Sequence, residues 1–210
     1  MTEPPGGCGG RGEHYFTRRP QAPHEIREVP FSAGQARLWL KTDRAVFSFR
    51  RVDPGTRLLA EAFDPQGAAT VVDVGAGYGA LGLMIKARYP QLQVLMVEIN
   101  ERAAGLARRN ALRNGLEVPV LIGDGLSALG GASAGAVVTN PPVRAGRHVI
   151  YTWMRQASQG VLVPGGSFWV VIRTRQGAES LARALEQWVG PVETVERGSG
   201  YRVLRARRPA

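Results

Sequence analysis

The sequence predicts an α/β fold in which helices cover both faces of a doubly wound, mainly parallel sheet. Apolar runs alternate with helical segments along most of the chain, the connections between them are short, and only residues 198–200 separate the last two extended runs. The alternation indicates right-handed crossovers between parallel strands. The short glycine-containing connection indicates an antiparallel C-terminal hairpin. With 210 residues, 44% of them hydrophobic, the chain can bury a substantial core.

Local patterns place the elements along the chain. The extended runs 26–31 and 36–40 are too small to fold alone, so we expect them to pack on the main body. Asp53 is a good N-cap and Pro54 suits the first helical position, so a helix is expected to continue through 58–63. The elements that follow are expected at 70–75, 80–89, 93–98, 101–114, 118–123, 136–139, 147–161, 167–174, 178–189, 191–197 and 201–206.

The charge balance favours a polyanionic partner. Lysine and arginine total 27 against 17 acidic residues, and almost all of the positive charge is arginine, whose planar guanidinium suits phosphate. An arginine-rich solvated surface is the alternative, because charge alone speaks only to non-specific binding. Cys8 is the only cysteine, which excludes an intrachain disulfide and fits a reducing cytosol. No apolar run is long enough to cross a bilayer, so we expect a cytoplasmic protein with neither a membrane partner nor a metal.

The most informative stretch is 71–82, an apolar run that contains Asp73 and breaks into alternating glycines before a helical segment. Strand, tight turn and helix N-terminus together predict a site for a nucleotide-like ligand. Gly77, Gly79 and Gly82 also satisfy the dinucleotide fingerprint, so a nicotinamide-dependent oxidoreductase stays open. Asp73 favours S-adenosylmethionine, because a carboxylate repels a pyrophosphate but attracts an ammonium and a sulfonium. The plainer alternative is that Asp73 only caps the next helix.

Further polar residues follow the next strands, at the edge where ligands of such sheets bind. Glu98 is placed to accept hydrogen bonds from both hydroxyls of a ribose. Asp124 is expected to accept from an adenine amino group, with Ile99 and Leu126 as apolar cover for the ring. Helix capping in the following turn is the alternative for both acids.

The segment Asn140-Pro141-Pro142 predicts a rigid corner that offers acceptors only. Two prolines remove two backbone donors and hold the chain out of a helix. The carbonyl oxygens of Asn140 and Pro141 and the side-chain oxygen of Asn140 are then three acceptors at the same corner. Such a corner accepts both hydrogens of a planar amine and aligns its nitrogen for in-line attack on a methyl group. No strong base is needed, because the proton becomes acidic once nitrogen carries the new methyl. A rigid turn without chemistry is the alternative.

These motifs resemble those of class I S-adenosylmethionine-dependent methyltransferases of the amino-methylating branch. Segments 42–48, 53–56, 171–178 and 200–203 further resemble the small-subunit ribosomal RNA guanine-N2 methyltransferase family and its archaeal relatives, and the match covers roughly 14–207. The resemblance implies a seven-stranded Rossmann-like sheet with a reversed terminal strand. It implies S-adenosylmethionine as the cofactor and RNA as the partner, with methyl transfer to an exocyclic amine, foremost guanine N2 in small-subunit ribosomal RNA or its particle.

The same resemblance assigns site residues and domains. Asn140, Pro141 and Pro142 are the expected catalytic residues. A flexible tail is expected at 1–12, an extension packed on the catalytic domain at 13–52, and the methyltransferase domain at 53–210. Bacterial members often carry a second, degenerate half that is not part of this match, so we expect help in RNA binding from elsewhere. The residues expected to bind the cofactor are Phe47, Ser48, Asp73, Gly75, Ala76, Gly77, Glu98, Ile99, Asp124, Gly125 and Asn140.

The substrate side departs from the family pattern at one position. Val143 stands where members frequently have an aromatic residue that stacks on the target base. Such stacking contributes on the order of 1–3 kcal/mol, so another ring is expected to supply it. The candidates for this ring are Tyr15, Phe16, Phe31 and Trp39.

Basic residues follow the two prolines and are expected to line the substrate mouth. These basic residues are Arg144, Arg147 and His148, and Val143 is expected to line the mouth with them. Phosphate contacts there would position an extruded base. Two other readings stay open. One is the same chemistry on adenine in nucleic acid or on a protein glutamine, and the other is an RNA-binding or assembly protein without catalysis.

Overall fold

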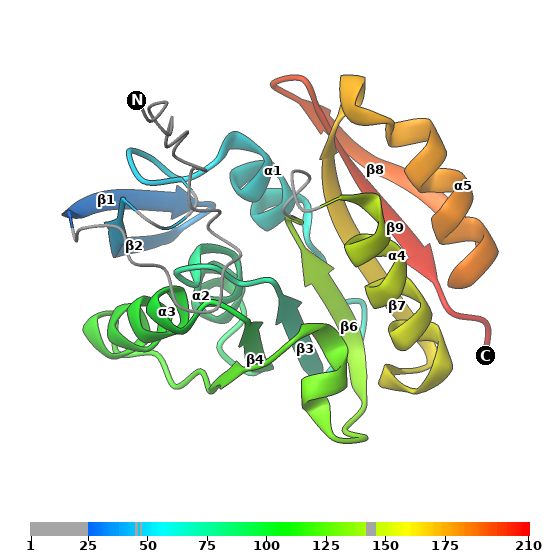
Figure 1. The fold of residues 1–210 in the computed structure, drawn as a ribbon, viewed down its shortest axis with the longest axis horizontal. Coiled ribbons are helices and arrows are strands. Elements are labelled where there is room, and N and C mark those ends of the chain that lie inside the picture. Colours follow the sequence, from blue (N-terminus) through cyan, green and yellow to red (C-terminus); the bar gives the residue numbers. More distant parts are fainter. Residues whose placement is uncertain (1–24, 45, 47, 142–145) are drawn as a thin grey trace, which may run out of the picture.

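The computed structural model describes residues 25–44, 46, 48–141 and 146–210 (Figure 1). A seven-stranded sheet runs in the order β5-β4-β3-β6-β7-β9-β8. The neighbours from β5 to β7 are parallel, and β9 is antiparallel to both β7 and β8. The predicted doubly wound sheet with an antiparallel C-terminal hairpin is confirmed. The strands are β3 (Thr70–Val74), β4 (Gln93–Glu98), β5 (Val120–Ile122), β6 (Ala134–Thr139), β7 (Leu162–Arg173), β8 (Val192–Gly198) and β9 (Tyr201–Arg207).

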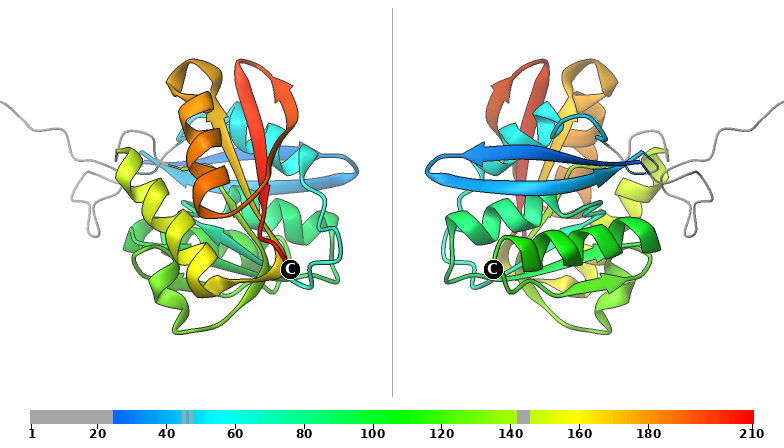
Figure 2. Two further views of the ribbon diagram at one scale, coloured as in Figure 1. Left: turned by 90° about the vertical axis from the view of Figure 1, so that its right-hand side faces the viewer. Right: turned by 90° about the vertical axis from the view of Figure 1, so that its left-hand side faces the viewer.

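Helices cover both faces of the sheet, as Figures 1 and 2 show. Side chains alternate along each strand, so Val71 packs into one hydrophobic core and Val72 into the other. Helices α1 (Pro54–Ala62), α2 (Ala80–Arg88) and α3 (Glu101–Arg113) belong to the first core. Helices α4 (Arg147–Gln156) and α5 (Ala178–Trp188), with the short helices η1 (Gly125–Leu129) and η3 (Ala157–Val161), belong to the second. A third short helix, η4 (Thr174–Gln176), follows β7.

A separate two-stranded hairpin precedes α1. Strands β1 (Ile26–Ala33) and β2 (Ala36–Asp43) pair antiparallel, where two extended runs were predicted. The inner face carries Val29, Phe31 and Leu40, which are buried in the first core together with residues of α2 and α3. The hairpin lies across these helices in the right-hand view of Figure 2. The fold therefore places the hairpin on the same body as the sheet.

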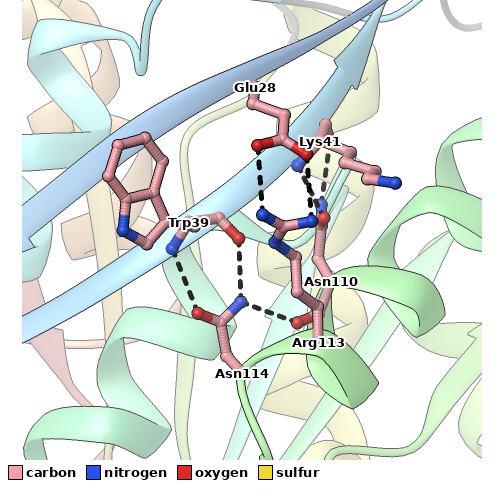
Figure 3. Close-up of polar contacts among 6 residues, drawn as sticks. All are labelled: Glu28, Trp39, Lys41, Asn110, Arg113 and Asn114. Atoms are coloured by element: carbon pink, nitrogen blue, oxygen red, sulfur yellow. Dashed lines mark hydrogen bonds and ion pairs between the residues drawn. The ribbon is translucent and has the colours of Figure 1, made fainter.

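Asn110 of α3 and Asn114, the C-cap residue of that helix, bind the open edge of β2 (Figure 3). Asn114 accepts from the Trp39 backbone N–H and donates to the Trp39 carbonyl, each at 3.0 Å. One helical turn earlier, Asn110 accepts from the Lys41 N–H at 2.7 Å and donates to the Lys41 carbonyl at 2.9 Å. These amides satisfy the backbone groups that an unpaired edge strand leaves exposed. Asn110 also donates to the carbonyl of Tyr78 at 2.9 Å, which ties the hairpin to the glycine loop.

Several element boundaries differ from the sequence prediction. The helix expected at 147–161 ends at Gln156, and a π-helical turn, in which Gly160 has a non-helical conformation, completes the segment. Strand β7 begins at Leu162 rather than at 167. The added segment is held to the end of the chain, because Gly165 N–H donates to the carbonyl of Arg208 and Arg208 N–H donates to the carbonyl of Gly166. Strand β5 is shorter than predicted and covers only Val120–Ile122.

Candidate active site

A cavity of about 470 Å³ opens at the carboxyl ends of β3, β4 and β6, where ligands of doubly wound sheets bind. The glycine loop after β3, the turn after β4, the start of η1 and the turn after β6 form its walls. Most of the residues predicted for the site line this one cavity. They are Ser48, Asp73, Gly75, Ala76, Gly77, Glu98, Ile99, Asp124, Gly125, Asn140, Pro141 and His148.

Some predicted site residues lie elsewhere. Phe47, Pro142, Val143 and Arg144 are outside the described residues, as are Tyr15 and Phe16. Arg147 is not among the residues that line the cavity, and its guanidinium donates to the Ser180 hydroxyl near the start of α5 at 3.5 Å. This contact links the first residue of α4 to the first turn of α5.

Two predicted apolar contacts are wrong. Leu126 is buried in the second core and does not line the cavity. Phe31 is only 1% exposed on the inner face of the hairpin, so it cannot stack on a base. Trp39, on the outer face, is 55% exposed.

Asp73 closes the N-terminus of α2 from inside the protein. Its Oδ2 accepts from the Gly82 N–H at 2.8 Å, and the residue is 1% exposed. Burial raises the pKa of Asp73 to about 7; the Gly82 hydrogen bond lowers it, and the neighbouring Glu98 charge adds to the rise. The predicted helix cap is therefore present, and it occurs in a residue that also lines the cavity. A cation in the cavity would relieve the cost of ionising this acid.

Glu98 joins the glycine loop to the next strand end. Its Oε2 accepts from the Gly77 N–H at 2.7 Å and its Oε1 from the Asn100 N–H at 2.8 Å. Burial raises the pKa of Glu98, and these backbone hydrogen bonds oppose the rise. Asn100, rather than Glu98, caps α3 through Arg102 and Ala103. Each carboxylate oxygen keeps a second lone pair, so Glu98 can still accept from a ligand's hydroxyl groups.

The two buried acids decide between the cofactor classes that the glycines allow. The N–H groups of Gly77 and Gly82 already donate to Glu98 and Asp73, whereas a pyrophosphate needs these donors for itself. An ionised carboxylate at the loop would also repel it. Asp124, at the next strand end, makes no side-chain cap to η1 and lines the cavity. The site fits a ligand with cationic groups and hydroxyls rather than a dinucleotide.

Asn140 is held in one orientation by the start of α1. Its Nδ2 donates to Asp53 Oδ1 at 3.0 Å and to Thr56 Oγ1 at 2.8 Å. A carboxylate only accepts, so the nitrogen of this amide must face Asp53. The side-chain oxygen then lies on the opposite side of the amide group, in a residue that lines the cavity.

Asp53 collects hydrogen bonds from three parts of the chain. As predicted it caps α1, where its Oδ1 accepts from the N–H groups of Gly55 and Thr56. Its Oδ2 accepts from the Tyr201 hydroxyl at 3.0 Å. Burial and the Asp53 charge raise the pKa of Tyr201 to about 12, so the phenol stays protonated and donates. The first residue of β9 thus supports the corner that follows β6.

Sequence reasoning missed the aromatic wall of the cavity. Trp153 of α4 and Tyr78 of the glycine loop both line it and are nearly buried. A Cβ added to Gly75, whose φ is +72°, would lie 2.8 Å from the Trp153 ring. The indole therefore packs directly on the glycine loop. The sequence did contain a signal for Trp153, because Val149 and Trp153 are one helical turn apart. They therefore lie on one face of the helix, next to His148, which was predicted to line the site.

Comparisons with known proteins identify the family. The profile of the methyltransferase small domain family matches residues 37–205, so the chain belongs to that family. Its fold is that of class I S-adenosylmethionine-dependent methyltransferases. Protein YbxB of Bacillus subtilis is 32% identical over 199 residues, which are 93% of this chain and 98% of that protein.

Two further comparisons concern longer proteins. Ribosomal RNA small subunit methyltransferase C of Pseudomonas fluorescens is 36% identical over 78% of this chain and 49% of its own length. The T. thermophilus 16S rRNA N2 G1207 methyltransferase RsmC, solved in complex with AdoMet and guanosine, superposes with a TM-score of 0.77. It is 30% identical in sequence, and the match covers 90% of this chain and 52% of that one. The chain therefore spans about half the length of these two relatives.

Two absences apply to the part of the chain that the structure describes. Within it, no group of three or more histidine, cysteine or acidic residues is arranged to hold a metal ion. None of the helices in that part is long and apolar enough to cross a membrane.

Proposed function

We propose that this protein transfers the methyl group of S-adenosylmethionine to the exocyclic N2 amine of a guanine in small-subunit ribosomal RNA. The observation that carries the proposal is the fixed orientation of Asn140. Asp53 and Thr56 accept hydrogen bonds from the Asn140 amide nitrogen at 3.0 and 2.8 Å. This leaves the amide oxygen to accept from a substrate amine. The names of the methyltransferase C relatives and of the guanosine complex support the same substrate.

The residues around the cavity fit the methyl donor. Asp73 would hold the ammonium group through Oδ1, since its Oδ2 is bonded to Gly82. Glu98 would accept from the ribose hydroxyls, and Asp124 is placed for the adenine amino group. Trp153 and Ile99 supply apolar surface for the ring. When bound, S-adenosylmethionine supplies an electrophilic methyl group.

The chain's own residues then act by placement. The Asn140 oxygen and the Pro141 carbonyl accept the two hydrogens of the planar amine, which raises electron density on its nitrogen and orients it toward the cavity. The methylated nitrogen becomes acidic, so its proton can pass to water after transfer. His148 lines the cavity and would contact the nucleotide at the substrate mouth.

An Asn140→Ala variant tests this proposal. It should still bind S-adenosylhomocysteine in a calorimeter but lose transfer of a tritiated methyl group to 16S ribosomal RNA. Asp73→Ala should lose donor binding itself. Undiminished transfer by the Asn140→Ala protein would refute the amine clamp. Nuclease digestion and nucleoside chromatography of the labelled RNA would identify the base, and label on adenine or on ribosomal protein would overturn the guanine assignment.

A further inference from the structure

A second cleft lies on the other side of the segment that carries Ser48 and Thr56. It has a volume of about 390 Å³ and lies between β1 and the start of α1. Arg50, Arg51 and Arg57 line it, and Val29 and Pro30 supply apolar surface. We call it the arginine cleft. The side chains of Arg50 and Arg51 are exposed, so both guanidinium groups can reach a ligand.

The acidic residues of the cleft only partly offset its positive charge. Glu28 is ion-paired with Arg113 of α3 at 2.9 Å (Figure 3), and Glu61 is an exposed residue of α1. Arg57 donates to the Ser32 carbonyl at 2.5 Å and lies over the Phe31 ring. Arg57 therefore braces the wall of the cleft, and Arg50 and Arg51 are the groups suited to phosphate.

An exposed aromatic side chain continues this surface across the hairpin. Pro30, which lines the cleft, is the cross-strand partner of Trp39, and directly opposed residues share one face of the hairpin at about 5 Å. Trp39 is 55% exposed. Asn114 binds both backbone polar groups of this residue (Figure 3). The indole is therefore presented to solvent from a rigid backbone.

The cleft and the active-site cavity share one segment of chain. Ser48 and Thr56 line the cavity, whereas Arg50, Arg51 and Arg57 line the cleft. Asp53, which orients Asn140, lies in the same segment, between the residues that line the cavity and those that line the cleft. A strand lying in the cleft would thus pass close to the corner that holds the target amine.

We infer that Trp39 and the arginine cleft bind the single-stranded RNA that flanks the target nucleotide. A base would stack on the Trp39 indole, and the adjacent phosphates would contact Arg50 and Arg51. A positively charged groove beside an aromatic platform is the arrangement that binds single strands irrespective of base identity, and RNA is read chiefly where its bases are unpaired. The inference rests on the proposed function for its choice of RNA as the polyanion.

Fluorescence anisotropy with a fluorescein-labelled single-stranded oligoribonucleotide tests the surface. Trp39→Ala should weaken binding by between about fivefold and about a hundredfold, and Trp39→Phe should restore most of the loss. Arg50→Gln with Arg51→Gln should lower the salt slope of the binding constant by about 0.7 for each lost phosphate contact. Trp188→Ala and Arg183→Gln are the matched controls, because both residues are exposed on α5, at the other end of the molecule (Figure 1).

Binding of S-adenosylhomocysteine should be unchanged in all of these proteins, which checks their folding. In methyl transfer, Trp39→Ala should raise the KM for RNA and leave kcat nearly constant. The inference fails if Trp39→Ala and the arginine pair bind RNA as the controls do. It fails equally if the loss appears only with assembled ribosomal particles, since the surface would then contact protein. If the variants lose RNA affinity while the native protein methylates no RNA, the surface stands and the proposed function falls.

Discussion

Thr56→Val removes one of the two contacts that orient Asn140 and preserves the shape of the side chain. The Thr56 hydroxyl accepts from Asn140 Nδ2 at 2.8 Å, whereas the Thr56 backbone N–H donates to Asp53. Valine keeps that backbone bond and the helix cap, so the fold should persist. A neutral hydrogen bond of this kind contributes about 0.5–1.5 kcal/mol net. If it acts only on the placement of the amine, kcat should fall by roughly 2- to 13-fold, because 1.36 kcal/mol is tenfold in rate.

Single-turnover methyl transfer with saturating donor and RNA measures this effect directly. Thr56→Ser keeps the hydroxyl and is the matched control, expected within about twofold of the native rate. Donor affinity should be nearly unchanged in both proteins. A native rate in Thr56→Val would refute the idea that Asn140 must be held from this side. Equal losses in the valine and serine variants would show that packing, and not the hydroxyl, matters.

Four further outcomes are expected. Burial puts the pKa of Asp73 near 7, and a cationic ligand favours the ionised form. Donor affinity should therefore fall about tenfold per pH unit below 7, and proton release on binding should appear in calorimetry. Asp73→Asn should flatten this pH profile. The neutral carboxyl also stabilises the fold below its ordinary pKa of 3.8, and this stabilisation should be lost as the pH rises through about 7. Gly75 has a φ of +72°, and a new Cβ there would lie 2.8 Å from the Trp153 ring. Gly75→Ala should therefore lower the free energy of thermal unfolding by about 1–2 kcal/mol and weaken donor binding. A donor affinity equal to that of the native protein would contradict the close packing. Asn110→Ala loses three hydrogen bonds and should lower the urea-unfolding free energy by about 3 kcal/mol at constant slope; a loss under about 0.5 kcal/mol would mean that water replaces them.

Local patterns were enough to predict most of the residues that line the cavity. Asp73 and Glu98 lie at or next to the carboxyl ends of their strands, and Asp124 lies two residues after the end of β5. Parallel strands bring their carboxyl ends to one edge. Their convergence on one cavity follows from that topology. Asn140 and Pro141 were recognisable in the same way, because two prolines fix the backbone wherever they occur.

The contacts that hold these residues were not predictable from local patterns. Asn140 is oriented by Asp53, which lies 87 residues earlier, and Asp53 is bonded to Tyr201, which lies 148 residues later. Nothing in the spacing of the chain reveals either pair. The same is true of Trp153 of α4, whose indole packs on Gly75 in the glycine loop. Boundaries such as the early start of β7 depended on backbone bonds from Arg208.

The sequence by itself determined the class of fold, the edge of the sheet where the site lies and the chemical groups available there. Hydrophobic periodicity, glycine and proline act within a few residues, so their consequences can be read without coordinates. Only the tertiary structure decided which atom of Asn140 is bound by Asp53 and Thr56, which acids are buried, and that Trp39 is exposed on the hairpin that lines the arginine cleft. Those properties depend on which distant segments meet, because burial and hydrogen-bond partners are set by packing.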